Sequence, residues 1–168
     1  RGIGTTVTRP DSGGFADAAL MMLARGDATV RDALEARVEI EVMVAGVAAE
    51  RHTPDDLEQI RARMTTFQST VRSEILAVRE ADLALHSAIL RATRLPVLIT
   101  LLGPLGELIQ RTSMTPNSTV RQFDVEKHLF IVDAIAARDV ESARTAMRRH
   151  FEFMEEPIYE AEIGRAHV

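Results

Sequence analysis

The chain has 168 residues, and 46 per cent of them are hydrophobic, which suits one domain with a well-filled core. Aromatic residues make up only 4 per cent, so the core is built from aliphatic side chains and methionine, a composition that favours helices over sheet. The net charge of −5 argues against a surface that grips nucleic acid, because such surfaces are basic. The absence of cysteine excludes disulfide and thiolate chemistry and fits a cytoplasmic protein.

Two further features argue against a membrane or secreted protein. The longest apolar run, residues 95–109, is broken by Pro104 and Glu107 and is shorter than the roughly 20 residues that a membrane span requires. The first residues lack the apolar segment of a signal peptide. We therefore expect a cytoplasmic protein that does not engage a membrane.

The N-terminal stretch differs in pattern from the rest of the chain. Residues 1–10 combine glycines with the β-branched run Thr5-Thr6-Val7-Thr8, which predicts a turn and a short strand. A single short strand is not stable in water, so we interpret residues 1–10 as the remnant of an upstream domain. The first residue is Arg1 rather than methionine, which fits a piece of a longer protein. Residues 11–29 are predicted to form a linker and a short helix.

Helical patterns fill the remainder of the chain. Thr29 predicts the start of a long helix that runs to about residue 51, and Thr53 with Pro54 predicts the start of the next. After a break at 69–73, a short helix is predicted over 74–78, followed by a helix around Asp82 that runs to about residue 94. The next helix is predicted to begin at Pro96 and to be interrupted at Pro104. After a polar loop at 112–119, the last two helices are predicted over 120–137 and from the N-cap Asp139 onwards. The predicted fold class is all-α, an antiparallel bundle of six to seven helices, with its main domain over 30–160 and a tail over 161–168.

Polar side chains with metal-binding chemistry interrupt the apolar faces of three predicted helices. Asp82 and His86 lie four residues apart and therefore point the same way from one helix. His128 and His150 lie on the apolar faces of two others. A buried carboxylate is costly without a partner, and three imidazoles with one carboxylate match the preferences of a divalent transition metal. The competing interpretation is core histidines bonded to carbonyl groups, because these residues form no short metal motif.

Other chemistries find less support. The chain contains no phosphate-binding loop and no nucleophile elbow. A metal-dependent hydrolase needs a general base, for which Glu80 and Glu126 are the nearest candidates, although solvated helix charges explain them better. His52 follows a predicted helix and is expected to be exposed. We assign no catalytic residue, and the alternatives that stay open are a metal-dependent enzyme on a helical bundle and a helical interaction domain with a structural metal.

The spacing of these residues resembles that of the FCD effector-binding domain of GntR-type transcription regulators. The resemblance covers roughly residues 30–155 and rests on Arg37…Glu41…Ala48-Ala49, Asp82-x-x-x-His86, and His128-x-x-Ile131-x-x-Ala134-Ile135-x-x-x-Asp139-x-x-x-Ala143-x-x-x-Met147-x-x-His150. Residues 2–7 resemble the end of the wing of that family's winged helix-turn-helix. Two departures stand out: Leu85 replaces the usual aromatic residue before His86, and Arg94-Leu95 stands where a Gly-Asn pair is common.

The resemblance implies an all-helical sensor rather than an enzyme. It implies a divalent metal such as zinc or nickel held by Asp82, His86, His128 and His150, and a small carboxylate effector beside it. Arg37 occupies the place of a residue that contacts the effector carboxylate. The domain would form a homodimer and reach DNA only through the upstream winged-helix domain. Which metal, which effector and which operator sequence are involved is not readable from the sequence.

Overall fold

The computed structural model describes residues 18, 21, 22, 25–27, 29–103 and 121–163. Every regular element within these ranges is a helix, so the all-α prediction is confirmed. The predicted strand at 1–10, the interruption at Pro104, the loop at 112–119 and most of the predicted tail lie outside the described residues.

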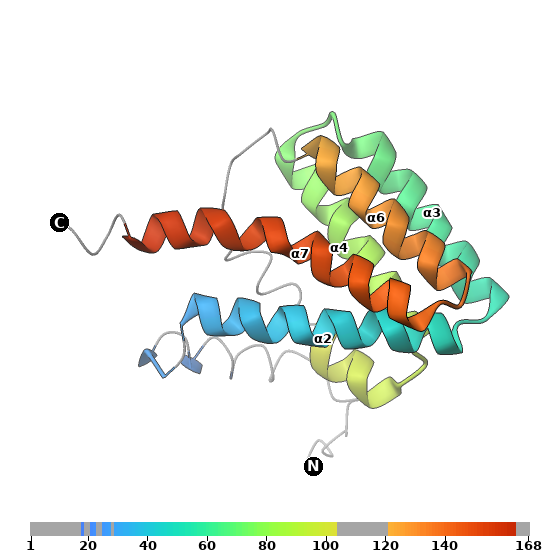
Figure 1. Cartoon of the computed structure of the whole chain (residues 1–168), viewed down its shortest axis with the longest axis horizontal. Coiled ribbons are helices and arrows are strands. Elements are labelled where there is room, and N and C mark those ends of the chain that lie inside the picture. The colour runs from blue at the N-terminus through green and yellow to red at the C-terminus, as the bar shows by residue number, and fades with distance from the viewer. Residues whose placement is uncertain (1–17, 19–20, 23–24, 28, 104–120, 164–168) are drawn as a thin grey trace, which may run out of the picture.

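The named helices are α2 (Val30–Arg51), α3 (Pro54–Thr70), α4 (Ile75–Ala92), α6 (Arg121–Ala136) and α7 (Val140–Ile163), and residues 96–103 are also helical. Figure 1 shows α2 and α7 side by side and running in opposite directions, with α3, α4 and α6 completing the bundle on one side of the molecule. The predicted break after α3 is present, but residues 74–78 do not form a separate helix. They continue into α4 because Arg79, Glu80 and Ala81 all favour a helix and nothing breaks it.

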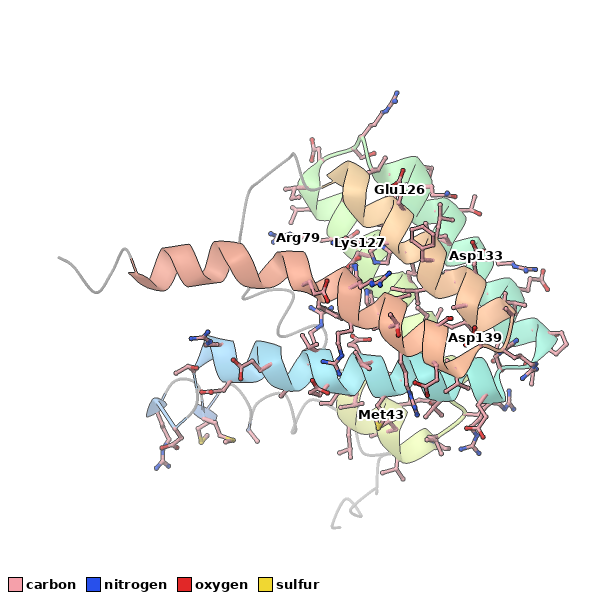
Figure 2. The ribbon with its side chains drawn as sticks, in the orientation of Figure 1. Met43, Arg79, Glu126, Lys127, Asp133 and Asp139 are labelled. Carbon is pink, nitrogen blue, oxygen red and sulfur yellow. The ribbon has the colours of Figure 1, made fainter. Side chains whose placement is uncertain are left out.

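Side chains at the predicted caps set the helix starts. Thr29 accepts a hydrogen bond from the Asp32 backbone at 3.1 Å, and the Asp32 carboxylate accepts one from the Thr29 backbone, which completes a capping box on α2. Thr53 caps α3 in the same way. The Asp139 carboxylate accepts from the backbone of Ser142 at 3.0 Å and caps α7 (Figure 2). The starts of these three helices match those predicted from the sequence, because capping depends on residues only three positions apart.

The core lies between the helices and is almost wholly aliphatic. On α3 the apolar residues Ile60, Met64 and Phe67 recur at helical spacing, and all three are buried. Gly46 allows α2 to approach α7 closely, because a Cβ atom there would come within 2.5 Å of Arg144 Nε. The other buried apolar residues are Val38, Val42, Val44, Ala45, Ala48, Ala49, Val78, Ala81, Leu85, Ile89, Leu90, Ala92, Ile131, Val132, Ile135, Ala143, Met147 and Phe151. No helix in the described parts of the chain is both long and apolar enough to cross a bilayer.

The expectation that His52 is exposed is wrong. Its side chain is only 5 per cent exposed, and its Nδ1 lies 3.0 Å from the carbonyl oxygen of Ala48. Arg138, in the turn after α6, donates hydrogen bonds to the carbonyl oxygens of Glu50 at 2.9 Å and His52 at 2.7 Å. A turn distant in sequence therefore covers the end of α2, and local sequence carries no signal of it.

Candidate metal centre

The structure brings the four predicted ligand residues together in the middle of the bundle. Asp82 and His86 come from α4, His128 from α6 and His150 from α7. One donor atom from each of the four lies within 4.8 Å of the others. His128 Nε2 is 3.0 Å from Asp82 Oδ1 and 3.3 Å from His86 Nε2, while His86 Nε2 is 3.9 Å from Asp82 Oδ1. We call these residues the Asp/His cluster.

The three histidines of the cluster are almost completely shielded from water. Their exposed fractions are 3 per cent for His86, 1 per cent for His128 and 4 per cent for His150. The Asp82 side chain keeps 23 per cent of its surface exposed. Aromatic rings close the remaining sides, with the ring centroid of Phe67 4.6 Å from that of His128 and that of Phe151 4.8 Å from that of His150. The cluster is therefore a polar pocket in an apolar core, with its one carboxylate towards the more open side.

The crowding of these groups shifts their ionisation. Burial alone would raise the pKa of Asp82, but the hydrogen bond from His128 and the neighbouring imidazolium charges hold it well below its usual range. Burial would lower the pKa of His86, but the carboxylates of Glu41 and Asp82 raise it. Burial and the charges of His128 and His86 place the pKa of His150 well below its usual value. When no cation is bound, the four side chains carry fewer protons than they have donor atoms, and these donor atoms face one another.

One unsatisfied atom in the cluster fits a bound cation. His150 Nδ1 is buried and has no hydrogen-bond partner. An unpaired buried polar atom is unfavourable, and such atoms in native structures often mark an absent ion or water. The donor set, three imidazoles and one carboxylate, is one that zinc, nickel and similar divalent ions accept. The residues present therefore fit a metal held by Asp82, His86, His128 and His150.

Glu41 lies beside the cluster, and the sequence did not assign it a role. Its Oε2 lies 3.2 Å from His86 Nδ1, on the side of the ring away from the cluster. Its Oε1 lies 3.6 Å from Arg37 Nε, and both side chains are largely buried. Burial would raise the pKa of Glu41, but the His86 and Arg37 charges lower it. The spacing of four on α2 showed that the two residues share a face, but only the tertiary structure placed that face against His86.

A small cavity adjoins the cluster. Its volume is about 30 Å³, enough for roughly two water molecules. Arg37, Glu41, His86 and Ser87 provide its polar groups, so the predicted carboxylate contact Arg37 does face a cavity next to the candidate ligands. The apolar lining comes from α2, α4 and the helical segment 96–103 and consists of Ile40, Val44, Leu83, Leu90 and Leu102, with Gly103 at its edge.

The remaining sequence observations have simple structural outcomes. Glu80 and Glu126 are exposed, Glu126 on α6 (Figure 2), and neither lies in the cavity lining. Leu85 is fully buried and fills the core beside His86. Arg94 has a left-handed backbone with φ of 55°, a conformation that glycine or asparagine adopts more readily. Arg94 therefore has a strained backbone, and its side chain forms an ion pair of 3.2 Å with Asp56.

Comparisons with known proteins identify relatives. The family model described as "FCD domain" matches residues 32–153. Among curated proteins, the "Putative L-lactate dehydrogenase operon regulatory protein" of Escherichia coli K12 is 34 per cent identical over 131 residues, covering 73 per cent of this chain and 49 per cent of its own length. The regulator LutR of Bacillus subtilis 168 is 30 per cent identical over 134 residues, covering 76 per cent of this chain and 61 per cent of its own.

Solved structures agree on the fold. McbR/YncC of E. coli superposes with a TM-score of 0.67 at 18 per cent identity, covering 79 per cent of this chain and 65 per cent of that one. A Streptococcus agalactiae GntR structure gives a TM-score of 0.64 at 21 per cent identity, covering 72 and 55 per cent. The chain spans about half the length of the curated relatives it matches.

Proposed function

We propose that this chain, which belongs to the FCD family of GntR-type transcription regulators, is the effector-sensing and dimerisation domain of a ligand-responsive DNA-binding protein. The family resemblance drawn from the sequence is confirmed. Both curated relatives reported above carry the names of regulators. The chain matches about half of the length of the first relative, and we assign DNA binding to a winged-helix domain upstream of it. A regulator of this kind acts in the cytoplasm.

The observation that carries the proposal is the convergence of the four donors of the Asp/His cluster within 4.8 Å. Bound there, a divalent transition metal would act as a Lewis acid that attracts a carboxylate. Metal analysis of protein purified without metal-affinity resin tests the site in wild type, His128→Ala and His150→Ala. We expect about one equivalent of metal in the wild type and a large loss in both variants. Equal metal content in all three would rule out the metal site.

The cavity beside the cluster suggests the class of effector. Arg37 supplies a positive charge, while Glu41 and Ser87 can accept hydrogen bonds from hydroxyl groups. A small hydroxycarboxylic acid matches this set of groups. The curated matches include regulators named for an L-lactate dehydrogenase operon and for a galactonate operon, both of which concern such acids. L-Lactate and D-galactonate are therefore the first probes.

Effector binding would be coupled to helix packing. The cavity is lined by α2, α4 and the helical segment after α4, so an acid bound there would contact all three elements and favour one arrangement of them over another. A coupling energy of about 1–3 kcal/mol between effector and DNA sites is sufficient for regulation. An acid present at about 100 times its Kd should stabilise the domain by about 2.7 kcal/mol in thermal denaturation. Arg37→Gln should abolish that gain. An acid that the protein converts rather than binds unchanged would instead support an enzyme.

The homodimer remains a prediction. Met43 is an exposed apolar side chain on α2 (Figure 2), and Val97 and Leu101 are exposed apolar side chains on the segment 96–103. These two elements line the same cavity, and exposed apolar side chains on neighbouring elements are candidates for a subunit interface. Sedimentation equilibrium of the wild type and Val97→Asp tests it. We expect a dimer that dissociates in the variant, and a wild-type monomer at micromolar concentration would contradict it.

A further inference from the structure

We propose that Glu41 is a positioning residue for metal binding, because it holds His86 in the orientation and tautomer in which Nε2 faces the Asp/His cluster. This inference rests on the proposed metal site. It adds to that site a residue on α2, a helix that contributes none of the four candidate ligands.

The hydrogen bond to Glu41 decides which nitrogen of His86 is available. His86 Nδ1 lies 3.2 Å from Glu41 Oε2, so the ring N–H donates to the carboxylate. The proton on Nδ1 leaves the lone pair on Nε2, and Nε2 is the atom that lies 3.3 Å from His128 Nε2 and 3.9 Å from Asp82 Oδ1. A histidine ligand commonly donates its second ring N–H to a carboxylate, which fixes the ring and makes it a better ligand.

The surroundings of Glu41 hold the carboxylate in place. Its side chain is only 13 per cent exposed, and its second oxygen faces Arg37 Nε at 3.6 Å. Arg37 is in turn buried, with its guanidinium carbon 5.1 Å from the ring centroid of Phe151. The Glu41 carboxylate accepts a hydrogen bond from His86 on one side and lies beside the Arg37 charge on the other. Turning away from either group would leave buried charge unpaired, so the carboxylate keeps its orientation towards His86.

The test measures Zn²⁺ affinity by competition with a chromophoric chelator, using the full chain after metal removal. Glu41→Ala should weaken Zn²⁺ binding by about 10- to 100-fold, the usual effect of removing such a partner. Glu41→Gln keeps an oxygen that can accept from Nδ1, so its loss should be smaller. Glu39→Gln is the matched control, since Glu39 is on the same helix, is exposed and pairs with Arg148 at 2.7 Å. The Glu39→Gln variant should bind Zn²⁺ with the same affinity as the wild type.

A second readout separates positioning from a purely structural role of the buried ion pair. The visible absorption of bound Co²⁺ reports the geometry of its ligands, so it should change in Glu41→Ala and resemble the wild type in Glu41→Gln. If Glu41→Ala does not fold without metal, Glu41→Gln is compared with Glu39→Gln, and a Zn²⁺ affinity of Glu41→Gln equal to that of the wild type overturns the inference. If both Glu41 variants bind Zn²⁺ as tightly as the wild type and give the same Co²⁺ spectrum, the role of Glu41 is overturned while the metal site itself stands. Failure of the wild type to bind Zn²⁺ or Co²⁺ would instead overturn the proposed metal site.

Discussion

Buried histidines occur in two regions of this molecule, and their surroundings differ. At the end of α2, His52 bonds to the carbonyl of Ala48, and Arg138 bonds to the carbonyls of Glu50 and His52. In the Asp/His cluster, three imidazoles face one another, and His150 Nδ1 has no partner. The histidines of both regions are almost fully shielded from water. The comparison teaches that burial of a histidine does not indicate a ligand site, whereas the state of its hydrogen bonds does.

The largest expected effect separates the two regions by their response to metal. Zn²⁺ at about 1,000 times its Kd should raise the free energy of unfolding by about 4 kcal/mol, because only the folded chain holds the assembled donors. His52→Ala should keep this gain despite a lower baseline stability, and His128→Ala should lose it. Urea denaturation with Zn²⁺ or with a chelator measures the difference. If Zn²⁺ stabilised His128→Ala as much as the wild type, the two regions would not differ in their response to metal.

A smaller effect is expected at the end of α2. Arg138→Ala removes two charged hydrogen bonds to helix-terminal carbonyls, and we expect a loss of about 1–3 kcal/mol in the free energy of unfolding. Zn²⁺ affinity should stay within about twofold of the wild type, since the two regions share no partner. Arg61→Ala, at an exposed position on α3, serves as the control and should change neither quantity. A large loss of Zn²⁺ affinity in Arg138→Ala would show that the regions are coupled.

The pH dependence of the metal-free protein should report the cluster. Because the folded state lowers the pKa of His150 from 6.5, the unfolded chain binds an extra proton below about pH 6.5. Stability should therefore fall as pH drops through this range, by at most about 1.4 kcal/mol per pH unit. His86, whose pKa the fold raises, opposes this slope near pH 6.5 and adds none towards pH 5, where it is protonated in both states.

Urea denaturation between about pH 5 and pH 6.5 measures this slope, above the range in which the carboxylates of Asp82 and Glu41 titrate in the unfolded chain. His150→Gln should flatten the slope, and His52→Ala should leave it unchanged. If the pH dependence of stability persists in His150→Gln, groups other than His150 cause it.

The smallest effect concerns two arginines with left-handed backbones, Arg94 with φ of 55° and Arg138 with φ of 58°. Glycine relieves the backbone strain at either position, by about 1 kcal/mol. At Arg94 the substitution removes the exposed ion pair to Asp56, so Arg94→Gly should change stability by less than about 1 kcal/mol. Arg138→Gly should be clearly destabilising because it also loses the two carbonyl bonds. Equal effects in thermal denaturation would contradict this account.

Much of the fold could be predicted because its signals are local. Capping pairs such as Thr29 with Asp32 lie within one turn, and the apolar stripe of α3 repeats at the helical period. The extra helix predicted at 74–78 was wrong because a boundary was placed where no residue breaks the helix. The environment of His52 could not be predicted, since the turn at Arg138 that covers it is 86 residues away.

For the candidate site, the sequence by itself determined which donors each helix offers: the spacing of four put Asp82 and His86 on one face, and the apolar stripes of α6 and α7 turned His128 and His150 inwards. Only the tertiary structure decided that these faces meet within 4.8 Å, and that Glu41 of α2 stands behind His86. The physical reason is that helical periodicity fixes direction around one axis, whereas the distance between donors depends on how separate helices pack, and packing is set by side chains far apart in the chain.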